Sequence, residues 1–254
     1  MKGTKALNRE PSQLTYLLLQ VRNPEDPIRE HEIDCFAKAL GCPVSNIRAH
    51  DLITRHPEPQ QIDQVDAVLI GGSGDFSVAR GGPWLPAAMS TFQDLHRIAK
   101  PTFASCWGFQ AFARALGGEV VHDISRAELG TLQMTLTPAG KTDPIFGPLG
   151  SPFQGQLGHE DIVDRLPAGA IRLASSEKVR NQAFTFFGKP IYCTQFHTER
   201  ECDDLIQRLS AYPSYLEKIM GWSIEEFRQH CHETPQTLLI LSRFANQLSQ
   251  LTTL

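Results

Sequence analysis

Cys106 occupies a position where a thiol can become a nucleophile. It follows the apolar segment 101–105, which reads as a strand, and precedes a helical segment that begins near Trp107. A helix N-terminus presents free N–H groups and partial positive charge, which lower the pKa of a thiol and favour the thiolate. Ala104 and Gly108 supply the small residues that such a tight turn requires. A cysteine packed in a buried turn explains the segment about equally well, so both interpretations stay open.

A histidine and a glutamate, His197 and Glu199, follow a predicted strand that ends near Gln195. Alternate residues of an extended chain point to the same side, so both side chains can face one site. A histidine can take the proton of a cysteine, and a carboxylate can fix the tautomer and orientation of that histidine. Taken alone, a His-x-Glu pair is more often an ordinary hydrogen-bonded histidine at the end of a strand.

The third feature is a glycine-rich turn, Gly71–Gly74, which directly follows the apolar segment 65–70. Glycines let backbone N–H groups turn toward a ligand, and such groups form an oxyanion hole when they point at a developing alkoxide. A phosphate-binding loop is the alternative. Neither a Gly-Lys-Ser/Thr sequence nor GxGxxG spacing follows, so that alternative is weak.

The elements that must position these residues alternate along the first half of the chain. Apolar runs predict buried strands, helical spacing of apolar residues predicts helices between them, and glycines close the helices. This alternation predicts an α/β fold with a mostly parallel central sheet and helices on both faces. The predicted strands are 14–21, 65–70 and 101–105, and the predicted helices are 28–40, 86–100 and 107–116.

The second half of the chain has a different pattern. Short strand-like segments separated by proline and glycine predict antiparallel additions to the sheet, at 131–136, 171–174, 183–187 and 191–195. From Glu199 onward the pattern is helical, with interruptions at Pro213, Gly221 and Pro235. We therefore expect a flexible tail at 1–13, one domain at 14–199, and a helical C-terminal extension at 200–254 that packs on the same domain.

Composition narrows the functional classes. The 254 residues carry a net charge of −4, which gives no electrostatic case for nucleic acid or an anionic membrane surface. No apolar stretch approaches a membrane span or a signal-peptide core, so we expect a cytoplasmic protein. The six cysteines form no CxxC pair and are expected to be reduced thiols. Residues 230–233 (His-Cys-His-Glu) have the wrong spacing for one metal site, and no metal is expected.

The three features, in this order, resemble the motifs of the class I glutamine amidotransferases. That family has a glycine-rich loop, then Gly-x-Cys-x-Gly-x-Gln, then Gln-Phe-His-Pro-Glu. This sequence has Gly71–Gly74, Ala-Ser-Cys-Trp-Gly-Phe-Gln at 104–110, and Gln-Phe-His-Thr-Glu at 195–199. It departs from the family pattern at Ala104, where glycine is usual, and at Thr198, where proline is usual. Neither departure removes a reacting group.

The resemblance covers about 14–199 and points to one branch of the family. The segment 159–169, which begins His-Glu-Asp-Ile-Val, looks like the His-x-Asp-x-Val-x-x-Leu-Pro stretch of domains related to GMP synthase. The Glu-Leu-Gly at 128–130 is similar to the same group. The resemblance therefore implies a flavodoxin-like fold and a stand-alone relative of the amidotransferase domain of GMP synthase.

The resemblance also implies a role for each matching residue. Cys106 would attack the side-chain amide of glutamine, His197 would transfer the protons, and Glu199 would orient His197. The N–H groups of Gly72 and Trp107 would bind the oxyanion.

Three further positions match residues beside the bound glutamine: Gly74, Gln110 and His159. No cofactor is implied. The ammonia acceptor would be held by a synthetase partner, because neither an ATP-binding loop nor a synthetase domain is present in the sequence; a homodimer is also possible. A γ-glutamyl hydrolase that acts alone and a non-catalytic binding protein that has kept the fold stay open as alternatives.

Overall fold

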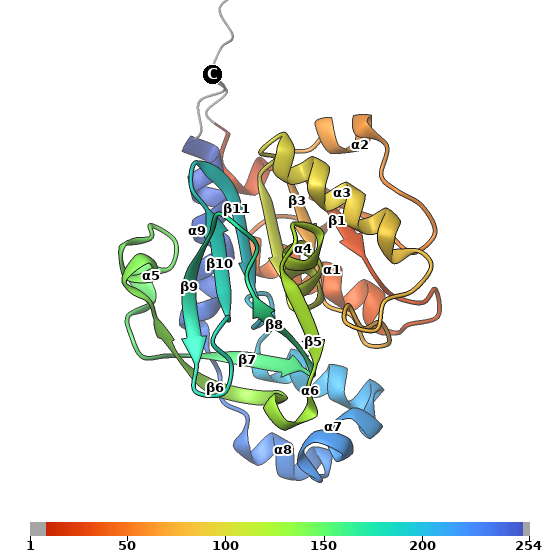
Figure 1. The fold of residues 1–254 in the computed structure, drawn as a ribbon, viewed down its shortest axis with the longest axis vertical. Helices are drawn as coiled ribbons and strands as arrows, with labels where there is room; N and C mark the ends of the chain where they lie inside the picture. The colour runs from red at the N-terminus through yellow and green to blue at the C-terminus, as the bar shows by residue number, and fades with distance from the viewer. Residues whose placement is uncertain (1–8, 251–254) are drawn as a thin grey trace, which may run out of the picture.

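The computed structural model describes residues 9–250. Across these residues the main sheet has nine strands in the order β2-β1-β3-β4-β11-β10-β9-β6-β7, and a small second sheet pairs β5 with β8 (Figure 1). The strands are β1 Tyr16–Gln20, β2 Ile47–Asp51, β3 Ala67–Ile70, β4 Thr102–Ser105, β5 Glu119–His122, β6 Glu128–Leu136, β7 Phe153–His159, β8 Asp161–Arg165, β9 Ala170–Ser176, β10 Ala183–Phe186 and β11 Lys189–Thr194.

Helices lie between many of the strands along the chain and pack on both faces of the main sheet. The α-helices are α1 Ile28–Leu40, α2 Pro59–Asp63, α3 Leu85–Arg97, α4 Trp107–Ala115, α5 Pro138–Thr142, α6 Cys202–Ala211, α7 Pro213–Met220, α8 Ile224–His230 and α9 Pro235–Gln250. Short 3-10 helices lie at Pro11–Gln13, Val44–Asn46, Ile124–Arg126 and Gly147–Leu149. Residues 1–8 of the predicted N-terminal tail lie outside the described residues.

Five neighbouring strands, β2, β1, β3, β4 and β11, run parallel, and the remaining pairs of the main sheet are antiparallel. The predicted α/β fold, with a parallel centre, helices on both faces and antiparallel additions, is confirmed. One placement was wrong: the segment 191–195 was expected among the antiparallel additions, but β11 pairs parallel with β4 and antiparallel only with β10. An apolar strand is buried beside either kind of neighbour, so its sequence does not reveal the pairing.

Alternate residues of the central strands supply two separate apolar cores. Leu18 and Leu69 face α1 and α9, whereas Leu17 and Val68 face α3 and α4. This division follows from the two-residue repeat of a strand, which sends successive side chains to opposite faces. Burial of each such side chain stabilises the fold by about 1.5–3 kcal/mol, so the rigid sheet is a firm base for the turns at its edge.

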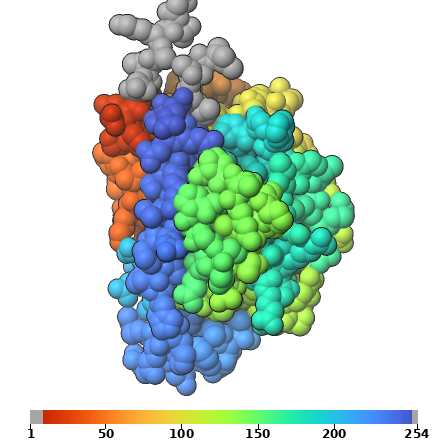
Figure 2. Space-filling view, turned by 90° about the vertical axis from the view of Figure 1, so that its left-hand side faces the viewer, coloured from red at the N-terminus to blue at the C-terminus, as the bar shows by residue number. Residues whose placement is uncertain are grey.

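The C-terminal helices contact two regions of the molecule. The helices α6, α7 and α8 lie at one end and share a third apolar cluster that includes Leu205, Leu216 and Phe227 (Figure 1). The helix α9 then runs back along the sheet, and Figure 2 shows it between the N-terminal segments and the region of α5. Its Phe244 is fully buried, with its ring centroid 5.5 Å from that of Phe103.

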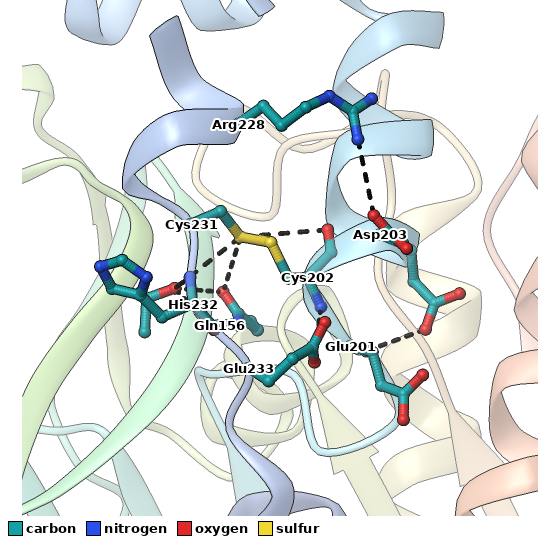
Figure 3. The surroundings of a disulfide bond; sticks show 10 residues. Gln156, Glu201, Cys202, Asp203, Arg228, Cys231, His232 and Glu233 are labelled. Carbon is teal, nitrogen blue, oxygen red and sulfur yellow. Dashed lines mark hydrogen bonds and ion pairs between the residues drawn. A yellow bond between two sulfur atoms is a disulfide. The ribbon is translucent and has the colours of Figure 1, made fainter. Parts of the chain in front are cut away.

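The prediction that all six cysteines are reduced thiols is wrong for two of them. A disulfide joins Cys202 at the start of α6 to Cys231 just after α8, with 5.9 Å between the Cα atoms (Figure 3). The two residues are 29 positions apart, and only the packing of α6 against α8 brings them together. Spacing along the chain could not reveal this pair. Cys35, Cys42, Cys106 and Cys193 are free thiols.

Candidate active site

The register of the sheet brings the two predicted catalytic segments to the same edge. Thr194 at the end of β11 pairs with Ser105 at the end of β4, so Cys106 and His197 follow neighbouring strand ends. The carboxyl ends of parallel strands are where ligands bind in open α/β sheets. Residues distant in sequence therefore reach one site because β4 and β11 are adjacent.

Cys106 occupies a strained turn between β4 and α4. Its φ of 52° and ψ of −105° lie outside the regions that residues with a side chain usually adopt, at a cost of about 1–3 kcal/mol. Two backbone hydrogen bonds hold the turn: the Cys106 N–H donates to the Thr194 carbonyl at 2.8 Å, and the Gly108 N–H donates to the Gly71 carbonyl at 3.1 Å. A Cβ at Gly108 would stand 2.7 Å from the Ile70 carbonyl oxygen, so the turn requires glycine there.

His197 and Glu199 form a fully buried pair beside this thiol. The Nδ1 atom of His197 lies 2.6 Å from Glu199 Oε1, and the other carboxylate oxygen accepts from the Thr198 N–H at 3.0 Å. The Nε2 atom of His197 is buried and has no hydrogen-bond partner among residues 9–250. A Cβ built on Gly72 would be 3.2 Å from His197 Cε1 and 3.9 Å from Cys106 Sγ, so imidazole and thiol border the same glycine.

The charges of this group shift the pKa of each member. Burial raises the pKa of Cys106, but the neighbouring His197 and the positive charge of Arg208 together lower it further than burial raises it, and the net pKa lies below the usual value. Burial raises the pKa of Glu199, whereas His197 and then Arg200 lower it, to about 2. Burial lowers the pKa of His197, but Glu199 and Cys106 together raise it above the usual value. The arrangement therefore favours a thiolate beside an imidazolium held by a carboxylate.

The predicted oxyanion-hole donors are the N–H groups of Gly72 and Trp107. Gly72 borders Cys106 and His197, and Trp107 directly follows Cys106. Among the described residues, no acceptor receives a hydrogen bond from the N–H of Gly72 or from that of Trp107, the first residue of α4. Behind the glycine turn, the buried Glu32 carboxylate pairs with Arg22 at 2.8 Å, and a Cβ on Gly71 would collide with that carboxylate. Gly71, the first residue of the turn, is thus packed on a buried ion pair, which limits the freedom of that residue.

The three predicted substrate-contacting residues, Gly74, Gln110 and His159, line one cavity with Cys106. Gln110 Nε2 donates to the Asp161 carbonyl at 2.9 Å, which fixes its amide. His159 is engaged at both ring nitrogens: Nε2 lies 3.1 Å from Glu128 Oε2, and Nδ1 lies 3.1 Å from the Asp161 carbonyl. Gln110 Nε2 also donates to Gln195 Oε1 at 3.1 Å, so Gln110 can offer a ligand only its Oε1 atom, whereas both ring nitrogens of His159 are engaged.

The cavity has a volume of about 130 Å³ and includes residues that sequence reasoning missed. Asp161 closes one wall by accepting from Ser77 Oγ at 2.7 Å and pairing with His122 at 3.0 Å. Arg208 on α6 and Tyr215 on α7 also line the cavity.

One signal in the sequence could have revealed Arg208. It stands three residues after Leu205 and one before Leu209, so a charged residue lies on the apolar stripe of a helix. The full lining is Ser73, Gly74, Asp75, Phe76, Ser77, Arg80, Cys106, Trp107, Gln110, His122, Gly158, His159, Glu160, Asp161, Arg208 and Tyr215.

One group of side chains away from this cavity has the composition of a metal site. His31, Cys35 and Asp204 bring their ligand atoms within 4.8 Å of one another. His31 Nε2 already pairs with the Asp204 carboxylate at 3.1 Å, and burial raises the pKa of Cys35, which keeps its thiol protonated. The group serves as a polar contact between α1 and α6. Cys231, in the segment 230–233, is in the disulfide.

Comparison with known protein families matches residues 31–205 to the family described as glutamine amidotransferase class-I. Similar curated proteins include the glutamine-hydrolyzing GMP synthase of Christiangramia forsetii, 32% identical over 146 residues, which are 57% of this chain and 26% of that protein. One of the subunits of the glutamine-hydrolyzing GMP synthase of Archaeoglobus fulgidus is 28% identical over 140 residues, 55% of this chain and 69% of the archaeal protein. The chain thus matches about a quarter of the length of the larger synthases.

Solved structures share the fold across nearly the whole chain. A glutamine amidotransferase from Thermotoga maritima superposes with a TM-score of 0.74 at 19% identity, covering 93% of this chain and 98% of that one. A glutamine amidotransferase from Methylobacillus flagellatus gives a TM-score of 0.66 at 17% identity, covering 92% and 94%. Within residues 9–250, no helix is both long enough and apolar enough to cross a membrane. On the extent of the family match, this chain belongs to the class I glutamine amidotransferases.

Proposed function

We propose that this chain hydrolyses the side-chain amide of glutamine through a thioester on Cys106. One observation carries the proposal: a buried thiol with a lowered pKa at a strained strand-to-helix turn, beside a histidine whose far nitrogen is held by Glu199 at 2.6 Å. A nucleophile, a base and a residue that orients the base are the parts that cysteine-dependent amide hydrolysis requires.

In the first half of the reaction, the Cys106 thiolate attacks the amide carbon and a carbon–sulfur bond forms. The carbonyl electrons move to oxygen, which accepts hydrogen bonds from the N–H groups of Gly72 and Trp107. The imidazolium of His197 donates its Nε2 proton to the amide nitrogen. The carbon–nitrogen bond then breaks, ammonia leaves, and a γ-glutamyl thioester stays on the enzyme.

In the second half, His197 Nε2 takes a proton from a water molecule as the water oxygen attacks the thioester carbon. The tetrahedral oxyanion forms at the same N–H groups, the carbon–sulfur bond breaks, and glutamate and the thiolate are restored. Glu199 stays ionised at neutral pH because its pKa is about 2, so the imidazole keeps its orientation through both halves.

We further propose that the ammonia passes to an acceptor on a synthetase partner. The support is the similarity to proteins named as GMP synthases and to a protein named as one of the subunits of such a synthase. A two-protein enzyme avoids wasting glutamine if hydrolysis accelerates when the partner binds, and we expect slow hydrolysis by the isolated chain. The glycine turn Gly71–Gly74 is the element that a partner could adjust, because the productive geometry of an oxyanion hole depends on it.

A γ-glutamyl hydrolase that acts alone is the second candidate. It is favoured by the origin of the cavity wall: Arg208 and Tyr215 come from helices α6 and α7 of this same chain. A site closed by its own chain does not need a partner to exclude water.

Release of glutamate by the purified chain separates these functions, because glutamate is the product of both reactions. L-Glutamine yields ammonia beside it, whereas a γ-glutamyl peptide yields the free amino acid or peptide. The substrates are L-glutamine and γ-glutamyl peptides, each with and without cell extract. The test variant is Cys106→Ser, and the matched control is Cys193→Ser, which replaces another buried free thiol. Stimulation by extract with glutamine supports the partnered amidase, and rapid hydrolysis of γ-glutamyl peptides alone supports the hydrolase. Equal activity of wild type and Cys106→Ser would refute both.

A further inference from the structure

Arg208 is a buried cation in the cavity that the proposed mechanism does not use. It lies on α6 beyond residue 205, where the family match ends, and only 4% of the residue is exposed. It lines the same cavity as Cys106. A buried guanidinium is costly unless a partner compensates its charge, so its presence there requires an explanation.

The hydrogen bonds of Arg208 leave most of its donors unused. Nη2 donates to the Ser73 carbonyl at 3.0 Å, whereas Nε and Nη1 are buried without a partner among residues 9–250. Each buried donor without a partner costs about 1–3 kcal/mol. The Tyr215 hydroxyl, on the same cavity wall, is also buried without a partner in this part of the chain.

The carboxylates Asp161 and Glu160 of the cavity form no ion pair with Arg208. Asp161 is engaged with Ser77 and His122, and Glu160 pairs with Lys218 at 2.6 Å. None of the ion pairs found between residues 9 and 250 includes Arg208. The unsatisfied donors therefore fit an anionic group that a ligand brings.

Gly158 lies close to both the Arg208 guanidinium and the Cys106 thiol. The Gly158 carbonyl oxygen is 3.7 Å from Cys106 Sγ, and a Cβ on the same glycine would be 3.2 Å from Arg208 Nη1. In extended glutamine, four carbon–carbon bonds of about 1.5 Å place the α-carboxylate carbon about 5 Å from the reacting amide carbon. A substrate of that length can reach both groups, and a planar guanidinium suits a carboxylate.

We propose that Arg208 binds the α-carboxylate of the substrate and so restricts the site to γ-glutamyl compounds whose α-carboxylate is free. This inference rests on the proposed glutamine hydrolysis and assigns substrate recognition to the C-terminal extension. A simpler structural role, in which Arg208 only supports the glycine turn through Ser73, predicts a different response to substrate charge.

Covalent labelling of Cys106 distinguishes the two roles without requiring turnover. The probes are the diazoketone analogue of L-glutamine, its α-methyl ester, and iodoacetamide, with labelling rates measured by mass spectrometry. The variants are Arg208→Met and Arg208→Lys. Arg228→Met is the matched control, because it removes a 52% exposed guanidinium from the same extension (Figure 3).

The wild type is expected to react faster with the free acid than with the ester. Arg208→Met is expected to lower the free-acid rate about 10- to 150-fold, from hydrogen bonds to a charged group worth about 1.5–3 kcal/mol. The ratio of free-acid to ester rates cancels any change in the Cys106 thiol itself. Arg208→Lys should keep part of the preference, and Arg228→Met all of it.

Any of the following results would overturn the inference. If Arg208→Met keeps the free-acid preference, or slows acid, ester and iodoacetamide equally, Arg208 supports the glycine turn or the Cys106 thiolate and does not recognise the α-carboxylate, while the proposed glutamine chemistry stands. If wild type shows no preference for the free acid over the ester, the α-carboxylate is not recognised at all. Failure of the wild-type Cys106 to react with the glutamine analogue, despite reaction with iodoacetamide, would refute the proposed function as well.

Discussion

The Glu199→Gln substitution tests the electrostatic basis of the site. The surroundings lower the pKa of Glu199 from 4.5 to about 2, a preference for the carboxylate of about 3 kcal/mol. Glutamine has nearly the same shape but carries no charge, so the imidazolium of His197 loses most of that attraction. If the same energy is lost from the transition state, kcat falls about 150-fold. Binding of the substrate, which Glu199 does not contact, is expected to change little.

The same substitution has a second, independent consequence for the thiol. Glu199 raises the pKa of His197, and the His197 charge in turn lowers the pKa of Cys106. Removing the carboxylate lowers the imidazole pKa and so weakens the effect of His197, which lowers the thiol pKa. The direct effect of the Glu199 charge, which raises the thiol pKa, is also lost, but it is the smaller of the two, so the midpoint of iodoacetamide reactivity is expected to shift to higher pH.

The assay combines steady-state ammonia release with the pH dependence of Cys106 alkylation. Asp204→Asn is the matched control, because it neutralises another carboxylate that pairs with a histidine, His31 at 3.1 Å, outside the cavity. Unchanged kcat and an unchanged alkylation midpoint in Glu199→Gln would refute the reasoning. Another carboxylate, Asp161 or Glu160, would then have to orient the histidine.

Three further predictions follow from the thiols and the buried carboxylate. Limiting iodoacetamide should label Cys106 before Cys193, whose pKa is raised by burial; peptide mapping that finds Cys193 labelled first would contradict this. The double substitution Cys202→Ala and Cys231→Ala should lower the free energy of unfolding by about 3.6 kcal/mol, as loop closure over 29 residues predicts, and an unchanged urea midpoint would count against it. Because the folded-state pKa of Glu199 is lowered, its contribution to stability is present above pH 4.5 and is lost as the pH falls toward 2; Glu199→Gln should therefore lose less stability than wild type in acid-titration melts, and equal losses would contradict the prediction.

The local geometry around Cys106 and His197 could be read from the sequence, because local chemistry dictates it. The small residues around Cys106 and the glycine at 108 signal a tight strand-to-helix turn, because a Cβ at 108 would meet the Ile70 carbonyl. The two-residue spacing of His197 and Glu199 signals a shared face. These features require no knowledge of distant segments, and the structure brings the three side chains together.

The features that escaped prediction depend on long-range packing. The sequences of β11 and β4 do not reveal that these strands pair in parallel, because both are apolar and fully or largely buried. The Cys202–Cys231 pair arises only when α6 meets α8. Arg208 could be predicted in part. The sequence shows a charged residue on the apolar stripe of α6, but the closeness of Arg208 to Cys106 follows from how α6 packs over the glycine turn.

The central claim is that glutamine hydrolysis proceeds through a thioester on Cys106, and rapid acid quench followed by peptide mass spectrometry tests it most directly. With L-glutamine, we expect a γ-glutamyl adduct on the Cys106 peptide of the wild-type enzyme and none on the Cys193 peptide. The Cys106→Ser variant should show no thioester and no ammonia release. Ammonia release that persists in Cys106→Ser, or an adduct that maps to another cysteine, would contradict the claim.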